Sequence, residues 1–369
     1  MLRQYKLSDY RFRLVLWVAA LSILGILVIG SANQSYQRQQ IAGMILGIVV
    51  MVIVSLFDYK WVLNFYWLIY LAAAVLLLLV LLVGVEANGA VRWLNIAGFQ
   101  FQPSDIAKIM LILFFARFFE NRIDKLNKPR TVLFAVLLIG IQLFLIIQEP
   151  NLSTTIIVAV VFCVLYFMAG LSYKIIAGIL LVCIPVAVIV VSVLMQPQSD
   201  QSLLENYQLT RIYAWLYPED YPSESFQQQN SIVAIGSGQL YGKGLNNDDV
   251  SSVKNGNFIS FPQSDFIFSV VGEELGFIGC CIIVLLEFLI ALECLMVGRR
   301  ARELSGTLIC TGMAALVFFQ SFLNISVTTG LLPNTGITLP FVSYGLTSLV
   351  SFYIGIGFVL NVGLQTKKY

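Results

Sequence analysis

Long apolar segments separated by polar connections repeat along the whole chain. They predict helices at about 14–31, 41–57, 62–84, 104–119, 131–147, 152–169, 174–195, 266–297, 306–329 and 341–363. About 20 helical residues cross a hydrocarbon core about 30 Å thick, and a helix satisfies its own backbone in lipid. No ten-residue alternating pattern suggests a barrel strand. The pattern therefore predicts an all-α polytopic membrane protein with ten transmembrane helices.

We expect one integral membrane domain over residues 1–369. Its longest loop, residues 196–264, separates the seventh and eighth predicted helices. The first apolar run, Leu14–Gly30, follows four basic residues, as a signal peptide would. No small-residue cleavage site leads into a soluble domain, so we interpret this run as a spanning helix.

The distribution of basic residues predicts the orientation. With the N-terminus inside, sixteen lysines and arginines lie on the cytoplasmic side, one lies within a span, and five lie outside: Arg38, Arg92, Arg211, Lys243 and Lys254. Cytoplasmic loops of membrane proteins carry an excess of Lys and Arg. Both termini are therefore expected in the cytoplasm and the 196–264 loop outside.

Composition narrows the chemistry. The chain is 59% hydrophobic and 11% charged, with a net charge of +2, and it contains no histidine. Ser-His triads and His metal ligands are thus excluded, and proton transfer falls to a carboxylate, Lys, Tyr or Cys. The six cysteines all lie in apolar runs, where we expect buried thiols and no disulfide.

The segment SDFIFSVVGEELG places three carboxylates, Asp265, Glu273 and Glu274, at the mouth of an apolar run. An ionisable group at the hydrocarbon costs about 2.5–3.5 kcal/mol, so such groups line a cavity, pair, or do chemistry. Asp265 directly follows the long loop, where a water-soluble headgroup could reach it. It is our candidate for the catalytic group.

Two further polar motifs permit a structural or a functional interpretation. In GAVRWL and FQFQPSDIAK, Pro103 and Ser104 suit a helix start, and Asp105 and Lys108 lie three residues apart on one face. This pair is either a capping carboxylate with a paired lysine, or it holds a cation against a phosphate. In QEPNLST, turn and N-cap chemistry explains most residues, while Glu149 could face the same cavity.

The remaining two motifs contain glycine. Residues 227–245 have glycines at alternate positions, but no strand and no Gly-Lys-Ser/Thr ending, so a surface helix ending in glycine turns is favoured over a nucleotide loop. Residues 330–345 contain two prolines and several hydroxyls, including Ser343. Irregular backbone at membrane depth must be covered by protein or line a wet cavity, so this segment is expected to close one wall.

These motifs, in the order in which they follow one another along the chain and over nearly its whole length, resemble the SEDS family (shape, elongation, division and sporulation). The resemblance implies a ten-helix peptidoglycan glycosyltransferase of the bacterial cytoplasmic membrane, which polymerises lipid II at the outer face with a class B penicillin-binding protein. Carried over by motif, the essential aspartate of the family falls on Asp265. The acidic residue and the lysine of its QPSE-xx-K motif fall on Asp105 and Lys108. Short termini and loop spacing favour the RodA-like branch over the FtsW-like branch.

The implied chemistry agrees with the residues. A carboxylate base, Asp265, would take a proton from the acceptor sugar, and Lys108 and Arg92 would stabilise the departing pyrophosphate. Asp105, Glu149 and Ser343 complete the candidate cavity. No spacing demands a metal, although a bridging Mg²⁺ or Mn²⁺ is compatible with phosphate chemistry.

Membrane lipids are the other expected partners. We expect no binding of nucleic acid. A flippase or transporter, or a scaffold of the cell-wall machinery, are the alternative functions. A transporter would place its polar residues near mid-membrane, whereas these motifs crowd one side.

Overall fold

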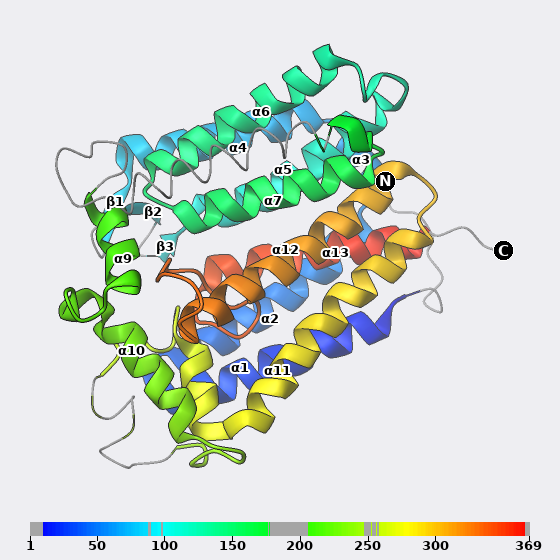
Figure 1. Cartoon of the computed structure of the whole chain (residues 1–369). Helices are drawn as coiled ribbons and strands as arrows, with labels where there is room; N and C mark the ends of the chain where they lie inside the picture. The colour runs from blue at the N-terminus through cyan, green and yellow to red at the C-terminus, as the bar shows by residue number, and fades with distance from the viewer. Residues whose placement is uncertain are drawn as a thin grey trace.

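The structure is a computed structural model that describes residues 10–87, 90–96, 99–175, 177, 206–246, 252, 256 and 258–365. Its long helices run side by side (Figure 1). They are α1 (Phe12–Ala32), α2 (Gln34–Leu56), α4 (Tyr66–Val83), α5 (Pro103–Glu120), α6 (Pro129–Gln148), α7 (Leu152–Met168), α11 (Ile267–Arg299), α12 (Leu304–Thr328) and α13 (Leu346–Leu364). Shorter helices are α3 (Tyr59–Leu63), α9 (Asn206–Leu216), α10 (Pro222–Ser237) and the 3₁₀ turn η2 (Ile123–Lys125).

The helices confirm the polytopic membrane fold. Within the described residues, seven helices are long and apolar enough to span a membrane, and α7 is a shorter apolar helix. Helix α5 matches the predicted span 104–119 and carries charge in its first turn. The predicted span 174–195 lies almost wholly outside the described residues, so the count of ten stays a prediction.

Four predicted spans differ from the structure. The second begins at Gln34 and not near residue 41. The last helix begins at Leu346, because residues 341–345 form a turn in which Phe341 has φ +59°. The third predicted span begins with the separate helix α3, which ends before Asn64. The eighth is interrupted inside α11 at Gly276, whose φ of 65° and ψ of −164° are not helical. A hydropathy pattern does not report such breaks, because the side chains on both sides remain apolar.

A small antiparallel sheet was not predicted. Its strands β1 (Val85–Ala87), β2 (Ala90–Ile96) and β3 (Phe99–Phe101) lie in sequence order, with Leu94 opposite Phe101. Residues two apart on a strand share a face, and Arg92 and Leu94 of β2 are both buried. The sheet thus turns Arg92 toward the protein interior.

The helices form a buried centre and an apolar periphery. In the most apolar windows of α12 and α13, 72% and 78% of the residues are buried, against 22–33% for α2, α4, α6 and α11. The outward faces of the peripheral helices carry large apolar side chains such as Leu68, Leu82, Leu133 and Phe288. This arrangement is that of a bundle whose outer surface is solvated by lipid.

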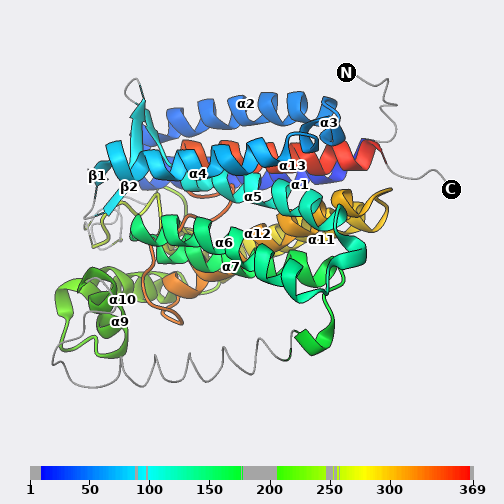
Figure 2. The ribbon, with the colours of Figure 1, turned by 90° about the horizontal axis from the view of Figure 1, so that it is seen from above.

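The ends of the bundle differ. Helix α1 begins and α13 ends at one end, while α9, α10 and the small sheet gather at the opposite end (Figures 1 and 2). The predicted polar motifs around residues 92, 149, 265 and 336 belong to this second end. The fold therefore keeps the described termini away from the candidate chemistry.

Close packing of α13 on α2 supports the centre and can be tested at Gly357. A Cβ there would lie 2.8 Å from the Met51 carbonyl oxygen and 2.9 Å from Val54 Cβ. We expect Gly357→Ala to cost about 1–3 kcal/mol through overpacking and to lower the Tm of the purified protein. Gly140→Ala is the control, since no atom lies within 4 Å of its added Cβ. Equal Tm values for the two variants would contradict this packing.

Candidate functional site

Asp265 lies in the turn that leads into α11. Its Oδ1 accepts a hydrogen bond from Ser264 Oγ at 2.9 Å. The Asn324 side chain of α12 donates to the Asp265 carbonyl oxygen at 2.8 Å and to the Ile337 carbonyl oxygen at 2.6 Å. One amide thus ties the backbone of the aspartate to the segment between α12 and α13.

Two arginines and the Asp265 carboxylate surround Gly336. A Cβ at Gly336 would lie 3.3 Å from Asp265 Oδ2, 3.7 Å from Arg92 Nη1 and 3.8 Å from Arg211 Nη1. Gly336 has φ +69°, a backbone conformation that favours glycine. Four chain segments that are distant in sequence therefore meet at one point: β2, α9, the turn before α11, and the α12–α13 connection.

Backbone oxygens orient both arginines. Arg92 Nε donates to the Glu149 carbonyl oxygen at 3.3 Å, and its Nη2 donates to the Pro150 carbonyl oxygen. Arg211 Nη1 donates to the Asn334 carbonyl oxygen at 3.2 Å. Guanidinium groups held in this way present several N–H donors in a fixed geometry, which suits an anionic oxygen ligand such as a phosphate.

The environment of Asp265 acts in both directions on its acidity. Burial raises the pKa of the carboxyl above its ordinary value, while the Ser264 hydrogen bond and the charges of Arg211 and Arg92 lower it. A desolvated carboxylate beside cations is a stronger base than an exposed one but stays ionisable. The site can thus hold a proton acceptor next to positive charge.

Glu149 is a second buried carboxyl of the site. It is fully buried, and neither of its side-chain oxygens has a hydrogen-bond partner among the described residues. Burial raises the pKa of Glu149 to about 8; the charge of Arg92 lowers it and that of Asp105 raises it. Glu149 is therefore mainly protonated at neutral pH, which leaves the nearby arginine charges uncompensated by this group.

Asp105 and Lys108 form the expected ion pair at the start of α5. Lys108 Nζ lies 2.8 Å from Asp105 Oδ1 and donates to Gln320 Oε1 at 2.9 Å. Gln320 in turn donates to the Thr338 carbonyl oxygen at 3.0 Å. The lysine is 3% exposed, so the pair has a packing role between α5, α12 and the α12–α13 connection. A phosphate contact by Lys108 stays a prediction.

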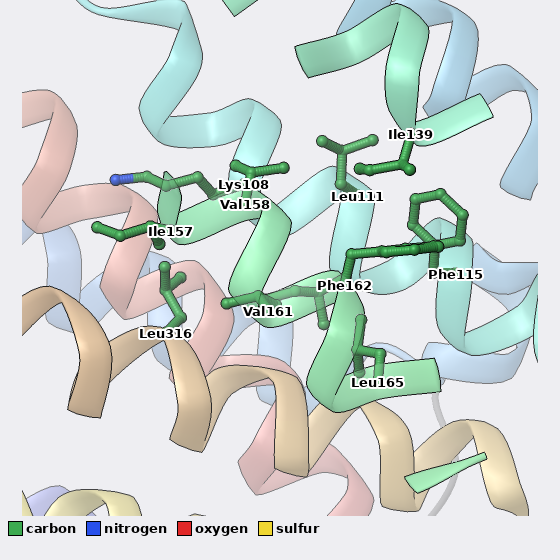
Figure 3. A pocket seen from close by; sticks show the side chains of 11 residues that line it. Lys108, Leu111, Phe115, Ile139, Ile157, Val158, Val161, Phe162, Leu165 and Leu316 are labelled. Carbon is green, nitrogen blue, oxygen red and sulfur yellow. The ribbon is translucent and has the colours of Figure 1, made fainter. Parts of the chain in front are cut away.

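A small apolar cavity lies beside the Lys108 stem. Figure 3 shows the side chains of α5, α6, α7 and α12 around it, with the Lys108 nitrogen directed away from them. Its volume of about 10 Å³ admits at most one water. The lysine stem thus packs against apolar side chains, while the ammonium reaches Asp105 and Gln320.

Ser343 has a structural role in the turn before α13. Its Oγ accepts the Leu339 N–H at 2.7 Å, and its carbonyl oxygen accepts Gln40 Nε2 at 3.1 Å. These bonds hold the turn that closes the α12–α13 connection.

The six predicted site residues thus divide into three sets. Arg92 connects Asp265 and Glu149, because it lies with the Asp265 carboxylate around Gly336 and donates to the Glu149 carbonyl oxygen. Asp105 and Lys108 join them through Gln320. Ser343 instead binds Leu339 within the turn before α13 and Gln40 of α2.

The α12–α13 connection, residues 329–345, is held from several sides. Trp215 of α9 donates to the Gly330 carbonyl oxygen at 2.8 Å, and Gln228 of α10 donates to that of Leu332 at 2.7 Å. Ser153 of α7 donates to the Thr335 carbonyl oxygen at 2.7 Å. The segment is thus held against α7, α9 and α10, and its role as one wall of the site stays a prediction.

Three residues of the site were missed. Arg211 could have been found, because it is a basic residue on the side that the positive-inside rule leaves poor in cations. Asn324 could have been found as one of two amide side chains in a mainly apolar helix, the other being Gln320. Gly336 gave no signal beyond its turn-forming neighbours.

Metal ligands do not cluster in the described part of the chain, where no three His, Cys, Asp or Glu side chains gather. A divalent cation at Asp265 would take its remaining ligands from substrate phosphate and water, a common mode for Mg²⁺.

Known protein sequences resemble this chain over most of its length. The profile of the FtsW/RodA/SpoVE family, described as "Cell cycle protein", matches residues 10–368. A probable peptidoglycan glycosyltransferase FtsW from Buchnera aphidicola is 32% identical over 81% of this chain and 73% of its own. The peptidoglycan glycosyltransferase MrdB of Escherichia coli is 32% identical over 96% of this chain and 93% of its own.

Solved structures share the fold. One chain of a peptidoglycan synthase complex, described as coordinating polymerization and crosslinking, has a TM-score of 0.80 at 28% identity, covering 96% of this chain and 97% of its own. The rod shape determining protein RodA of Thermus thermophilus has a TM-score of 0.70 at 26% identity, covering 98% of each chain.

Glu149 makes stability depend on pH. Between pH 4.5 and about pH 8 the folded protein holds a proton on Glu149 that the unfolded chain releases, so stability falls as pH rises through this window. We expect the Tm of Glu149→Gln to fall less over that window than the parental Tm. Glu219→Gln, at an exposed site, is the control. Parallel Tm curves for all three proteins would refute the buried, protonated state of Glu149.

Proposed function

Because the chain belongs to the SEDS family and is a peptidoglycan glycosyltransferase, we propose that it polymerises lipid II with Asp265 as the catalytic base. The observation that carries this assignment is the meeting of Asp265, Arg92 and Arg211 around Gly336. A base and two cations at one point are what transfer from a pyrophosphate-linked donor to a sugar hydroxyl requires.

Asp265 accepts the proton of the acceptor hydroxyl as the new glycosidic bond forms. That hydroxyl oxygen bonds to the anomeric carbon of the donor sugar, and the bond from this carbon to the phosphate oxygen breaks. Undecaprenyl pyrophosphate leaves with the electron pair. Ser264 holds the carboxylate and Asn324 holds the backbone of Asp265, so little reorganisation is needed as the proton moves.

Arg92 and Arg211 stabilise the departing pyrophosphate. Hydrogen bonds between guanidinium groups and phosphate are charge-assisted and about twice as strong as neutral ones. The protonated state of Glu149 supports this role, because an ionised carboxylate beside Arg92 would repel the pyrophosphate. Lys108 supports the site indirectly. It binds Gln320, which donates to the Thr338 carbonyl oxygen in the segment that carries Gly336.

The orientation that the basic residues favour supports a position of this site at the outer face. The site lies at the end opposite the start of α1 and the end of α13 (Figure 1), and the basic residues favour a cytoplasmic position for both termini. A lipid-linked donor can then keep its isoprenoid chain in the bilayer while its pyrophosphate reaches the arginines.

A class B penicillin-binding protein is the proposed partner. This is supported by the similarity to a chain of a peptidoglycan synthase complex described as coordinating polymerization and crosslinking. The relatives include both FtsW and MrdB, so the protein serves elongation or division, and the RodA-like branch stays a prediction.

The base assignment predicts the effect of Asp265→Asn. The amide keeps the size of the side chain but cannot accept the proton, so we expect lipid II polymerisation to fall by at least about 100-fold. Asp124→Asn, at an exposed position in the 3₁₀ turn η2 between α5 and α6, should retain parental activity. The measurement is glycan synthesis by purified protein in detergent or liposomes. Parental rates for Asp265→Asn would show that another group is the base.

The orientation predicts which side accepts a label. In a background without the native cysteines, Gln229→Cys on α10 should react with an impermeant maleimide in intact cells. Lys125→Cys, in the connection between α5 and α6, should react only after lysis. The reverse pattern would place the site in the cytoplasm and reject the proposed lipid II reaction at the outer face.

A further inference from the structure

Helix α11 is two helices joined at Gly276. The outer piece, Ile267–Leu275, begins two residues after Asp265, and the inner piece continues to Arg299. The φ and ψ of Gly276 lie in a region that is essentially restricted to glycine. Figure 1 shows the resulting change of direction near the end of the bundle that carries α10. The orientation of the outer piece is thus set at Gly276 and not by a continuous helix.

The break removes helical hydrogen bonds that another segment replaces. In a regular helix, Phe277 N–H would bind the Glu273 carbonyl and Ile278 N–H that of Glu274. Instead all four groups bind the residues that follow α10. Their bonds run from Phe277 N to Gln239 O (2.8 Å), Ile278 N to Leu240 O (3.2 Å), Lys243 N to Glu273 O (2.9 Å) and Gly244 N to Glu274 O (2.9 Å).

We call residues 238–246 the clamp segment. Its glycines permit the close approach: a Cβ at Gly238 would lie 1.9 Å from the Gly272 carbonyl oxygen, and one at Gly242 would lie 2.2 Å from that of Glu274. This contact explains two glycines of the series, Gly238 and Gly242, which the catalytic site does not use. The clamp segment caps both halves of the broken helix.

Side chains reinforce the clamp. Lys243 Nζ pairs with Glu273 Oε1 at 2.8 Å, with Glu273 3% exposed. Glu274 Oε1 accepts a hydrogen bond from Ser31 Oγ at 2.6 Å, and Ser31 Oγ accepts the Asn246 N–H at 2.8 Å. The ammonium of Lys243 also lies near the carbonyl end of the outer piece, where a cation is favourable. Two of the three carboxylates in SDFIFSVVGEELG therefore serve this joint.

We propose that Lys243 and Glu273 are positioning residues: they orient the outer piece so that the Asp265 carboxylate lies beside Gly336. This inference rests on the proposed role of Asp265. The outer piece and its leading turn span about 15 Å, so a tilt of about 4° at Gly276 moves Asp265 by about 1 Å. A misplacement of about 1 Å can cost about 100-fold in rate. The Lys243–Glu273 ion pair lies close to Gly276, where such a tilt would occur. Asn324 holds the opposite end of the outer piece, at the Asp265 carbonyl oxygen.

Lys243→Met tests the positioning role, because it keeps the aliphatic stem and removes the charge. We expect kcat for lipid II polymerisation to fall about 10- to 100-fold, with KM nearly unchanged, since Arg92 and Arg211 still hold the pyrophosphate. The charge swap Lys243→Glu with Glu273→Lys should restore much of kcat. Arg38→Met, at an exposed cation near the Ser31 end of the bundle, is the matched control.

A second readout does not use activity. Hydrogen–deuterium exchange should become faster in residues 239–246 and 272–279 of Lys243→Met and return to the parental rate in the swap. If the parental protein fails to polymerise lipid II, the proposed function fails while this exchange test still stands. Parental kcat in Lys243→Met, or no rescue of kcat and exchange by the swap, would overturn the positioning role.

Discussion

Backbone groups that lose their helical partners near the hydrocarbon must find partners elsewhere in the protein, and the outer end of this bundle is organised by that requirement. Two breaks occur there: one at Gly276 inside α11 and one between α12 and α13. The first is capped by the clamp segment, and the second is held by side chains from α7, α9, α10 and α12. The irregular backbone that lines the site is ordered because each break is satisfied by a different part of the chain.

Charge in the site is arranged by contacts of the same long-range kind. Arg92 and Arg211 are oriented by backbone carbonyls of other segments, and both lie with the Asp265 carboxylate around Gly336. Glu149 lies beside Arg92, but burial keeps it protonated near neutral pH. The buried Asp105–Lys108 pair is internally neutral. The described groups around Gly336 therefore combine net positive charge with a single ionisable carboxylate, which supports the proposed transfer from a pyrophosphate.

Polar residues of the spans and of the turns that join them divide into two groups by what they bind. Gln320 and Asn324 of α12 both reach carbonyl oxygens of residues 329–345, so they connect the helix core to the site. Ser343 and Glu274 close turns and joints. Polar side chains thus either connect the helix core to the site or hold its turns and joints, and only their contacts separate these roles.

The sequence by itself determined the polytopic helical fold, the family, and Asp265 as the candidate base. Apolar runs, the absence of histidine and an ordered set of motifs are properties of the linear chain. Tertiary structure alone decided that Arg211 lies beside Arg92, that Glu149 is sealed from solvent, and that Lys108 is turned toward Gln320. These outcomes depend on contacts between segments more than 50 residues apart, and on backbone breaks at glycine that leave hydropathy unchanged. The glycine-rich clamp was visible as a motif, but its partner across Gly276 could be identified only from the fold.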